Sequence, residues 1–137
     1  MEVLNIEISI KSEKKQIVEF LNELHDIINR DDFNIDKHFV FIKSKKEEVV
    51  FSTPYTIVDL DYDNMDVVNR LRELTILDYS ETLFDKDDEN PPLLFVFGKD
   101  INGKEVYIKL KIKGAETKKV LCVSFHYAKY KMDYPYA

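Results

Sequence analysis

Apolar and polar positions alternate most regularly near the C-terminus. In segment 104–113 the side chains expected on one side are apolar: Val106, Ile108, Leu110 and Ile112. The side chains expected on the other side are polar: Tyr107, Lys109, Lys111 and Lys113. Segment 119–127 alternates too, with Leu121, Val123 and Phe125 on one side and Cys122, Ser124 and His126 on the other. A period of two predicts two strands that each bury one face.

The polar face of these two strands is the first candidate site. If they pair as a hairpin, their apolar faces must match, because a slip of one residue would expose the core. The side chains expected on the opposite face are then Tyr107, Lys109, Lys111, Ser124 and His126. That face would present to water a phenol, a hydroxyl, ammonium groups and an imidazole.

Turn and helix signals place these strands in a larger fold. Asn102-Gly103 favours a hairpin, so segments 93–99, 104–113 and 119–127 are predicted to form an antiparallel meander. Apolar residues at helical spacing predict an amphipathic helix over 12–30, with Ser12 as its N-cap. A second helix is expected over 65–74, after a run of acidic residues.

The remaining segments give weaker patterns. Alternation over 3–10 predicts a strand, and 39–42 and 48–52 are interpreted as short strands. A loop is expected at 52–56, which contains a proline, and a short helical turn at 78–83.

Together these elements predict an α+β fold, in which an antiparallel sheet ends in a three-strand meander and packs against two helices. We expect a single domain, 1–137, because its length suits one hydrophobic core. Within it, 1–60 would form a strand, a helix and a variable region, and 61–127 a helix and the meander. Residues 128–137 form a tail rich in Tyr and Lys, part of which is expected to pack on the sheet.

Charge is distributed unevenly between the two ends of the chain. The net charge is −6, but residues 91–137 hold nine lysines against four acidic residues, a net charge of +5. Residues 1–90 therefore carry −11. The basic region is interpreted either as a phosphate-binding patch or as the solvated face of an alternating strand.

Other classes of site find little support in the sequence. The acidic run 59–66 lacks the Gly and the Glu that a calcium-binding loop requires, and the three histidines, at 25, 38 and 126, are scattered. We expect no metal and no cofactor. There is no apolar run long enough to span a membrane and no export signal, and Cys122 is the single cysteine, so a cytoplasmic protein is expected.

Several short motifs resemble the MqsR family of toxin ribonucleases. They are Leu71-Arg72-Glu73-Leu74-Thr75 followed by Asp78-Tyr79, the strand 103–112 and the strand 120–126, and together they span about half of the chain, residues 64–127. The fold of that family is similar to that of the RelE-type mRNA interferases. The resemblance therefore implies a RelE-like fold and a toxin–antitoxin endoribonuclease that cleaves mRNA without a metal.

The resemblance also implies roles for individual residues. Tyr107 matches the tyrosine of the family's strand motif, a candidate proton-transfer group, and Lys109 matches the lysine two residues further on. His126 occupies the position of the family's terminal lysine and could act as an acid or base near neutral pH. A further lysine of the family falls at Glu81, and its glutamine falls close to Val96.

The resulting hypothesis is an endoribonuclease whose catalytic residues are His126, Tyr107 and Lys109. Lys111, Lys99 and Ser124 would bind the substrate. Its partners would be mRNA and a cognate antitoxin that covers the same face. The alternative is a non-catalytic relative that binds a protein or nucleic acid through this face. A third hypothesis is a structural or regulatory partner whose acidic N-terminal portion mimics nucleic acid or covers the basic face.

Overall fold

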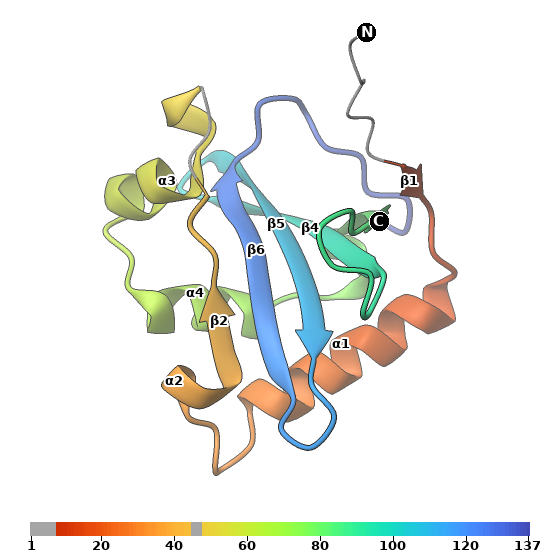
Figure 1. Ribbon diagram of the computed structural model, residues 1–137. Helices are drawn as coiled ribbons and strands as arrows, with labels where there is room; N and C mark the ends of the chain where they lie inside the picture. The colour runs from red at the N-terminus through yellow and green to blue at the C-terminus, as the bar shows by residue number, and fades with distance from the viewer. Residues whose placement is uncertain (1–7, 45–47) are drawn as a thin grey trace, which may run out of the picture.

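A six-stranded mixed sheet forms the centre of the molecule. The computed structural model describes residues 8–44 and 48–137 (Figure 1). The strands are β1 (Ser9–Ile10), β2 (Phe39–Phe41), β3 (Tyr79–Phe84), β4 (Leu93–Ile101), β5 (Lys104–Lys113) and β6 (Lys119–Tyr127). Their order across the sheet is β1-β3-β4-β5-β6-β2, and among these described strands β6 and β2 pair in parallel while the other pairs are antiparallel. The α+β class and the meander β4-β5-β6 are confirmed, but the sheet is mixed, not antiparallel throughout.

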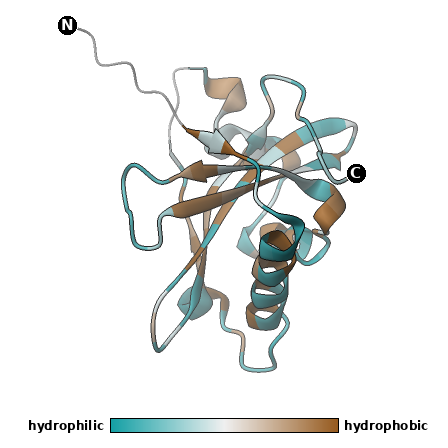
Figure 2. Cartoon of the chain, turned by 90° about the vertical axis from the view of Figure 1, so that its right-hand side faces the viewer, coloured by the Kyte–Doolittle hydropathy of each residue, from teal (hydrophilic) through white to brown (hydrophobic). Residues whose placement is uncertain are grey.

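Helices cover one face of the sheet and its β6 edge. They are α1 (Lys14–Ile28), α2 (Ile35–His38), α3 (Thr53–Leu60) and α4 (Asn64–Arg72), with 3₁₀ turns η1 (Val49–Phe51) and η2 (Ile76–Asp78). The apolar side of α1 packs on the sheet, where Phe20 stacks on Phe95 with ring centroids 4.3 Å apart. Figure 2 shows largely hydrophobic strands beside a helix of mixed character, as an amphipathic helix requires.

The C-terminal tail (128–137) packs on the opposite face. Both carboxylate oxygens of Glu105 hold it, one accepting from the backbone N–H of Met132 (2.8 Å) and the other from the hydroxyl of Tyr134 (2.6 Å). The Tyr134 ring lies against Gly98, where an added Cβ would stand 2.1 Å from the tyrosine oxygen. Glycine at this position therefore allows the tail to lie close to the sheet.

A bulge in β6 changes which residues face the helices. Lys109 pairs with Ser124 but Leu110 pairs with Cys122, so Val123 is the extra residue. Cys122 consequently points into the main core and is fully buried, which raises the pKa of its thiol. The prediction that Cys122 shares the polar face was wrong, because alternation in the sequence does not mark the bulge.

Segment 49–60 also differs from its prediction. Instead of a strand and a loop it forms η1 and α3, and the side chain of Ser52 caps α3 by accepting from the N–H of Tyr55. The hydroxyl oxygens of Thr53 and Thr56 accept the backbone N–H groups of β6 that β2 is too short to reach. This helix therefore completes the edge of the sheet.

Two further local predictions were wrong. Segment 79–84 is the strand β3, not a helical turn. Glu13, not Ser12, stands at the N-cap of α1, and the Ser12 hydroxyl is buried against that of Thr82, 2.7 Å away. The strand predicted over 3–10 lies mostly outside the described residues, and its described end, β1, pairs with β3.

Candidate functional site

Tyr107 and His126 form the centre of the candidate site. They are direct cross-strand neighbours on β5 and β6, and their rings stack with centroids 5.0 Å apart and planes inclined by 12°. The Nδ1 atom of His126 lies 2.9 Å from the carbonyl oxygen of Tyr127. Because a carbonyl oxygen can only accept, Nδ1 carries a proton, and this hydrogen bond fixes the ring orientation.

A second row of residues crosses the same face beside this pair. The register places Glu81 of β3 opposite Val96 of β4, Val96 opposite Lys109 of β5, and Lys109 opposite Ser124 of β6. Val96 is fully buried beneath the tail residue Met132. An ammonium group and a carboxylate therefore rise from either side of an apolar floor.

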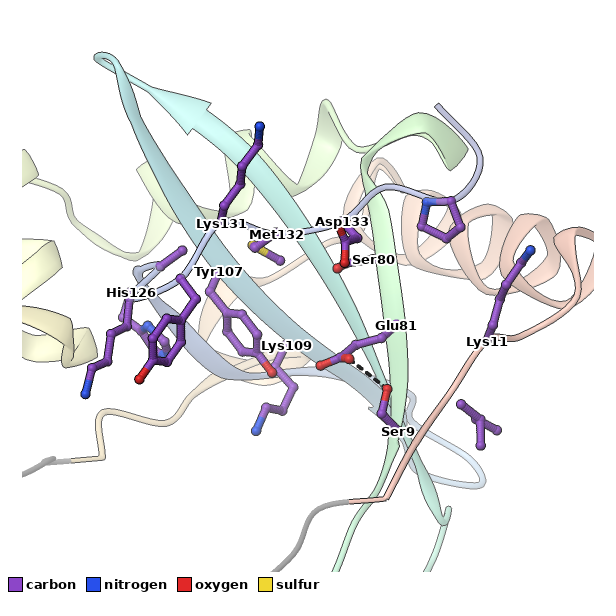
Figure 3. A pocket seen from close by; sticks show the side chains of 15 residues that line it. Ser9, Lys11, Ser80, Glu81, Tyr107, Lys109, His126, Lys131, Met132 and Asp133 are labelled. Atoms are coloured by element: carbon purple, nitrogen blue, oxygen red, sulfur yellow. Dashed lines mark hydrogen bonds between the residues drawn. The ribbon is translucent and has the colours of Figure 1, made fainter.

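These rows border a pocket between the sheet and the C-terminal tail, with a volume of about 760 Å³ (Figure 3). Its charged lining residues are Lys11, Lys109, Lys129, Lys131, Glu81 and Asp133. Lys129 is ion-paired with Glu48, and this hydrogen bond raises the pKa of its ammonium group. The pocket thus combines a modest positive charge with Tyr107 and His126 in its wall.

Three residues predicted to bind substrate do not line this pocket. Lys111 is almost fully buried, with its Nζ 2.7 Å from a carboxylate oxygen of Asp85 and 2.8 Å from the carbonyl oxygen of Asp88. Lys99 lies on the helix-covered face, 3.6 Å from a carboxylate oxygen of Glu73. Ser124 is buried next to Lys109.

The structure separates the predicted lysines because each strand has two faces. Lys99 pairs with Val106, whose side chain belongs to the core beneath the helices, so Lys99 and Lys109 lie on opposite faces. Lys111 shares the face of Lys109 but serves to anchor the β3–β4 loop. Among the predicted residues, the pocket therefore brings together Tyr107, Lys109 and His126.

Sequence reasoning missed several residues of the pocket. Lys11, Lys129 and Lys131 come from segments outside the meander. The tail was expected to pack on the sheet, but no sequence pattern shows on which face it lies or which of its lysines border the pocket. Glu81 was noted only as the position of a lysine of the family, and it was not named as a catalytic residue because a carboxylate reverses that charge. As a strand residue it points into the pocket, and its carboxylate accepts a hydrogen bond of 2.7 Å from the hydroxyl of Ser9.

The arrangement can bind an anion and move protons. Lysine ammonium groups attract phosphate, and imidazole, phenol and carboxylate are all groups that exchange protons in enzymes. Within residues 8–44 and 48–137, no group of three or more His, Cys, Asp and Glu side chains could hold a metal ion. No helix in that part of the chain is long and apolar enough to cross a membrane.

Comparisons with protein-family models, with curated proteins and with solved structures find no match to this chain.

Proposed function

We propose that the protein is a toxin-type endoribonuclease that cleaves mRNA without a metal, by attack of a ribose 2′-hydroxyl on the adjacent phosphate. The observation that carries this proposal is the stacked pair of Tyr107 and His126 beside Lys109 in one lysine-lined pocket. The RelE-like arrangement is part of the same proposal, since the meander β4-β5-β6 bears these residues on the face away from α1.

Such a reaction makes three demands on the enzyme. One group removes the proton of the 2′-hydroxyl, another protonates the leaving 5′-oxygen, and a cation stabilises the charge that develops on the phosphoryl oxygens. His126 supplies a group that transfers protons near neutral pH. Lys109, on the neighbouring row, supplies the cation, and Lys11 and Lys131 extend the positive lining along the pocket.

A cognate antitoxin is the natural inhibitor of such an enzyme. An inhibitor that covers the pocket would meet lysines from β5 and from the tail, so an acidic segment of the antitoxin fits this face.

The alternative function is binding without cleavage. It is favoured by the two carboxylates, Glu81 and Asp133, which stand among the lysines and reduce the attraction of the pocket for a polyanion. In that case the pocket would bind a protein or nucleic acid partner without catalysing a reaction.

Incubation of the purified protein with RNA, with and without EDTA, separates these functions. The nuclease proposal expects cleavage that persists in EDTA and falls at least about 100-fold in His126→Ala, the usual scale of a lost proton-transfer group. His38→Ala is the matched control, because His38 lies on α2, away from the pocket. Intact RNA that binds wild-type protein would favour the alternative.

A further inference from the structure

We infer that Glu81 is the general base of the proposed reaction and that His126 is its general acid. This inference rests on the proposed function and names the group that takes the proton of the 2′-hydroxyl. Tyr107, which the family resemblance suggested for proton transfer, would instead position the imidazole.

The placement of Glu81 and His126 suits an in-line displacement. Attacking and leaving oxygens lie on opposite sides of the phosphorus, so base and acid must approach from opposite sides. Glu81 is on β3 and His126 on β6, three strand spacings apart, which is roughly 14 Å across the sheet. His126 also lies two residues along β6 from Ser124, the residue in the row of Glu81. Figure 3 shows Tyr107 and Lys109 between them, where a phosphate would be held.

Tyr107 is poorly placed to act as the general base on the side of the phosphate opposite His126. Its ring lies almost parallel to that of His126, and the two are direct cross-strand neighbours. Both rings therefore approach a bound phosphate from the same direction. Of the carboxylates, imidazole and phenols that line the pocket, Glu81 is the proton acceptor that rises from the sheet on the far side of Lys109.

Local contacts hold Glu81 in place. The hydroxyl of Ser9 donates to Oε2, and β1, which carries Ser9, is itself hydrogen-bonded to β3. This bond engages one carboxylate oxygen and orients the other, Oε1. The row neighbour Val96 is apolar and buried, so it offers the carboxylate no hydrogen bond from its side chain.

The step balances without a co-reactant. A carboxylate oxygen of Glu81 accepts the 2′-hydroxyl proton as the 2′-oxygen bonds to phosphorus. The bond from phosphorus to the 5′-oxygen breaks, and the leaving oxygen takes a proton from His126. The products are a 2′,3′-cyclic phosphate and a 5′-hydroxyl, and solvent returns the proton from Glu81 to His126.

Two substrates distinguish a base from an acid. One is an RNA dinucleotide, whose 5′-oxygen must be protonated as it leaves, and the other is a nucleoside 3′-(4-nitrophenyl phosphate), whose phenolate leaves without a proton. Glu81→Gln should slow both at least about 100-fold, whereas His126→Ala should slow the dinucleotide far more than the nitrophenyl ester.

Controls separate this inference from the proposed function. Glu116→Gln, in the exposed β5–β6 turn, makes the same chemical change away from the pocket and should leave both rates unchanged. Circular dichroism and RNA affinity check that Glu81→Gln folds and binds. The role of Glu81 is refuted if wild-type protein cleaves RNA and Glu81→Gln cleaves it at a rate within about threefold. It is also refuted if Glu81→Gln cleaves the nitrophenyl ester at the wild-type rate. In both cases the nuclease function remains supported. If wild-type protein cleaves neither substrate, both fall.

Discussion

Tyr107 and His126 face each other across β5 and β6 with their rings nearly parallel, 5.0 Å between centroids. The stack covers one side of the imidazole, and the carbonyl of Tyr127 holds its Nδ1 proton. The two contacts together leave the ring little freedom to rotate. We therefore assign Tyr107 a positioning role that depends on its ring more than on its hydroxyl.

Substitutions of Tyr107 test this role. Tyr107→Phe keeps the ring and should cleave RNA within about threefold of wild type, whereas Tyr107→Ala should lose at least about tenfold, because misplaced catalytic groups cost rate steeply. Steady-state kinetics add a second readout, since Tyr107→Ala should lower kcat while leaving the KM for RNA nearly unchanged. Equal losses in the two variants would instead assign chemistry to the hydroxyl.

Lys109 should contribute to RNA binding through charge. Removing one phosphate contact reduces the slope of log affinity against log salt by roughly 0.7 for a single strand. Lys109→Ala should show this change in a filter-binding titration with uncleavable RNA. Lys119→Ala removes the same charge from an exposed position outside the pocket and is expected to leave the slope unchanged. Equal slopes for Lys109→Ala and wild type would contradict the placement of phosphate.

Lys111 should matter for stability instead. Its side chain is 1% exposed and paired with Asp85, so Lys111→Met leaves that carboxylate without its partner in a partly buried site. Breaking a buried pair in this way costs about 3 kcal/mol, measured as the free energy of urea unfolding. Lys113→Met is the control, because Lys113 is 43% exposed and its pair with Asp88 lies at the surface, where losing an ion pair changes the free energy of unfolding little. Similar losses in the two variants would show that burial does not distinguish the pairs.

Two carboxyl groups of the same loop should make the stability of the fold depend on pH. Burial acts to raise the pKa of Asp85, but hydrogen bonds from Lys111 and the backbone outweigh it, so the pKa lies below its usual value. The hydrogen bond from Lys113 lowers the pKa of Asp88 to about 2. Carboxyl groups with depressed pKa values stabilise the fold above their unfolded pKa of about 4, and this contribution is lost as the pH falls through the folded values.

The free energy of unfolding should therefore fall between about pH 4 and pH 2. The double variant Asp85→Asn, Asp88→Asn should be less stable at neutral pH, and its stability should change less over that range. Urea denaturation at a series of pH values measures both effects. If the free energy of unfolding of the variant falls with pH as steeply as that of the wild type, other carboxyl groups determine the pH dependence.

Periodicity predicted the elements that lie in the middle of the fold. The meander, α1 and α4 follow from alternation of period two and from helical spacing, because burial of one face enforces those patterns. The pairing of Tyr107 with His126 also followed, since the bulge at Val123 lies before both Ser124 and His126 and leaves their register with β5 intact.

The rest of the site depends on tertiary contacts that no local pattern records. Glu81 enters the pocket because β3 pairs with β4 and β1, and Lys131 because Glu105 holds the tail. Lys99 has the same charge as Lys109, but its side chain lies on the opposite face of the sheet, where it pairs with Glu73. Strand register and the path of the C-terminal tail across the sheet thus determine which lysines lie at the site. The number of lysines in the sequence does not.

The ends of the cleaved RNA test the central claim most directly. Wild-type protein incubated with a 5′-labelled RNA oligonucleotide in EDTA should leave 2′,3′-cyclic phosphate and 5′-hydroxyl ends, the products of 2′-hydroxyl attack, and His126→Ala should leave the RNA intact over the same time. Uncut RNA with the wild type, or ends carrying 3′-hydroxyl and 5′-phosphate, would contradict the account.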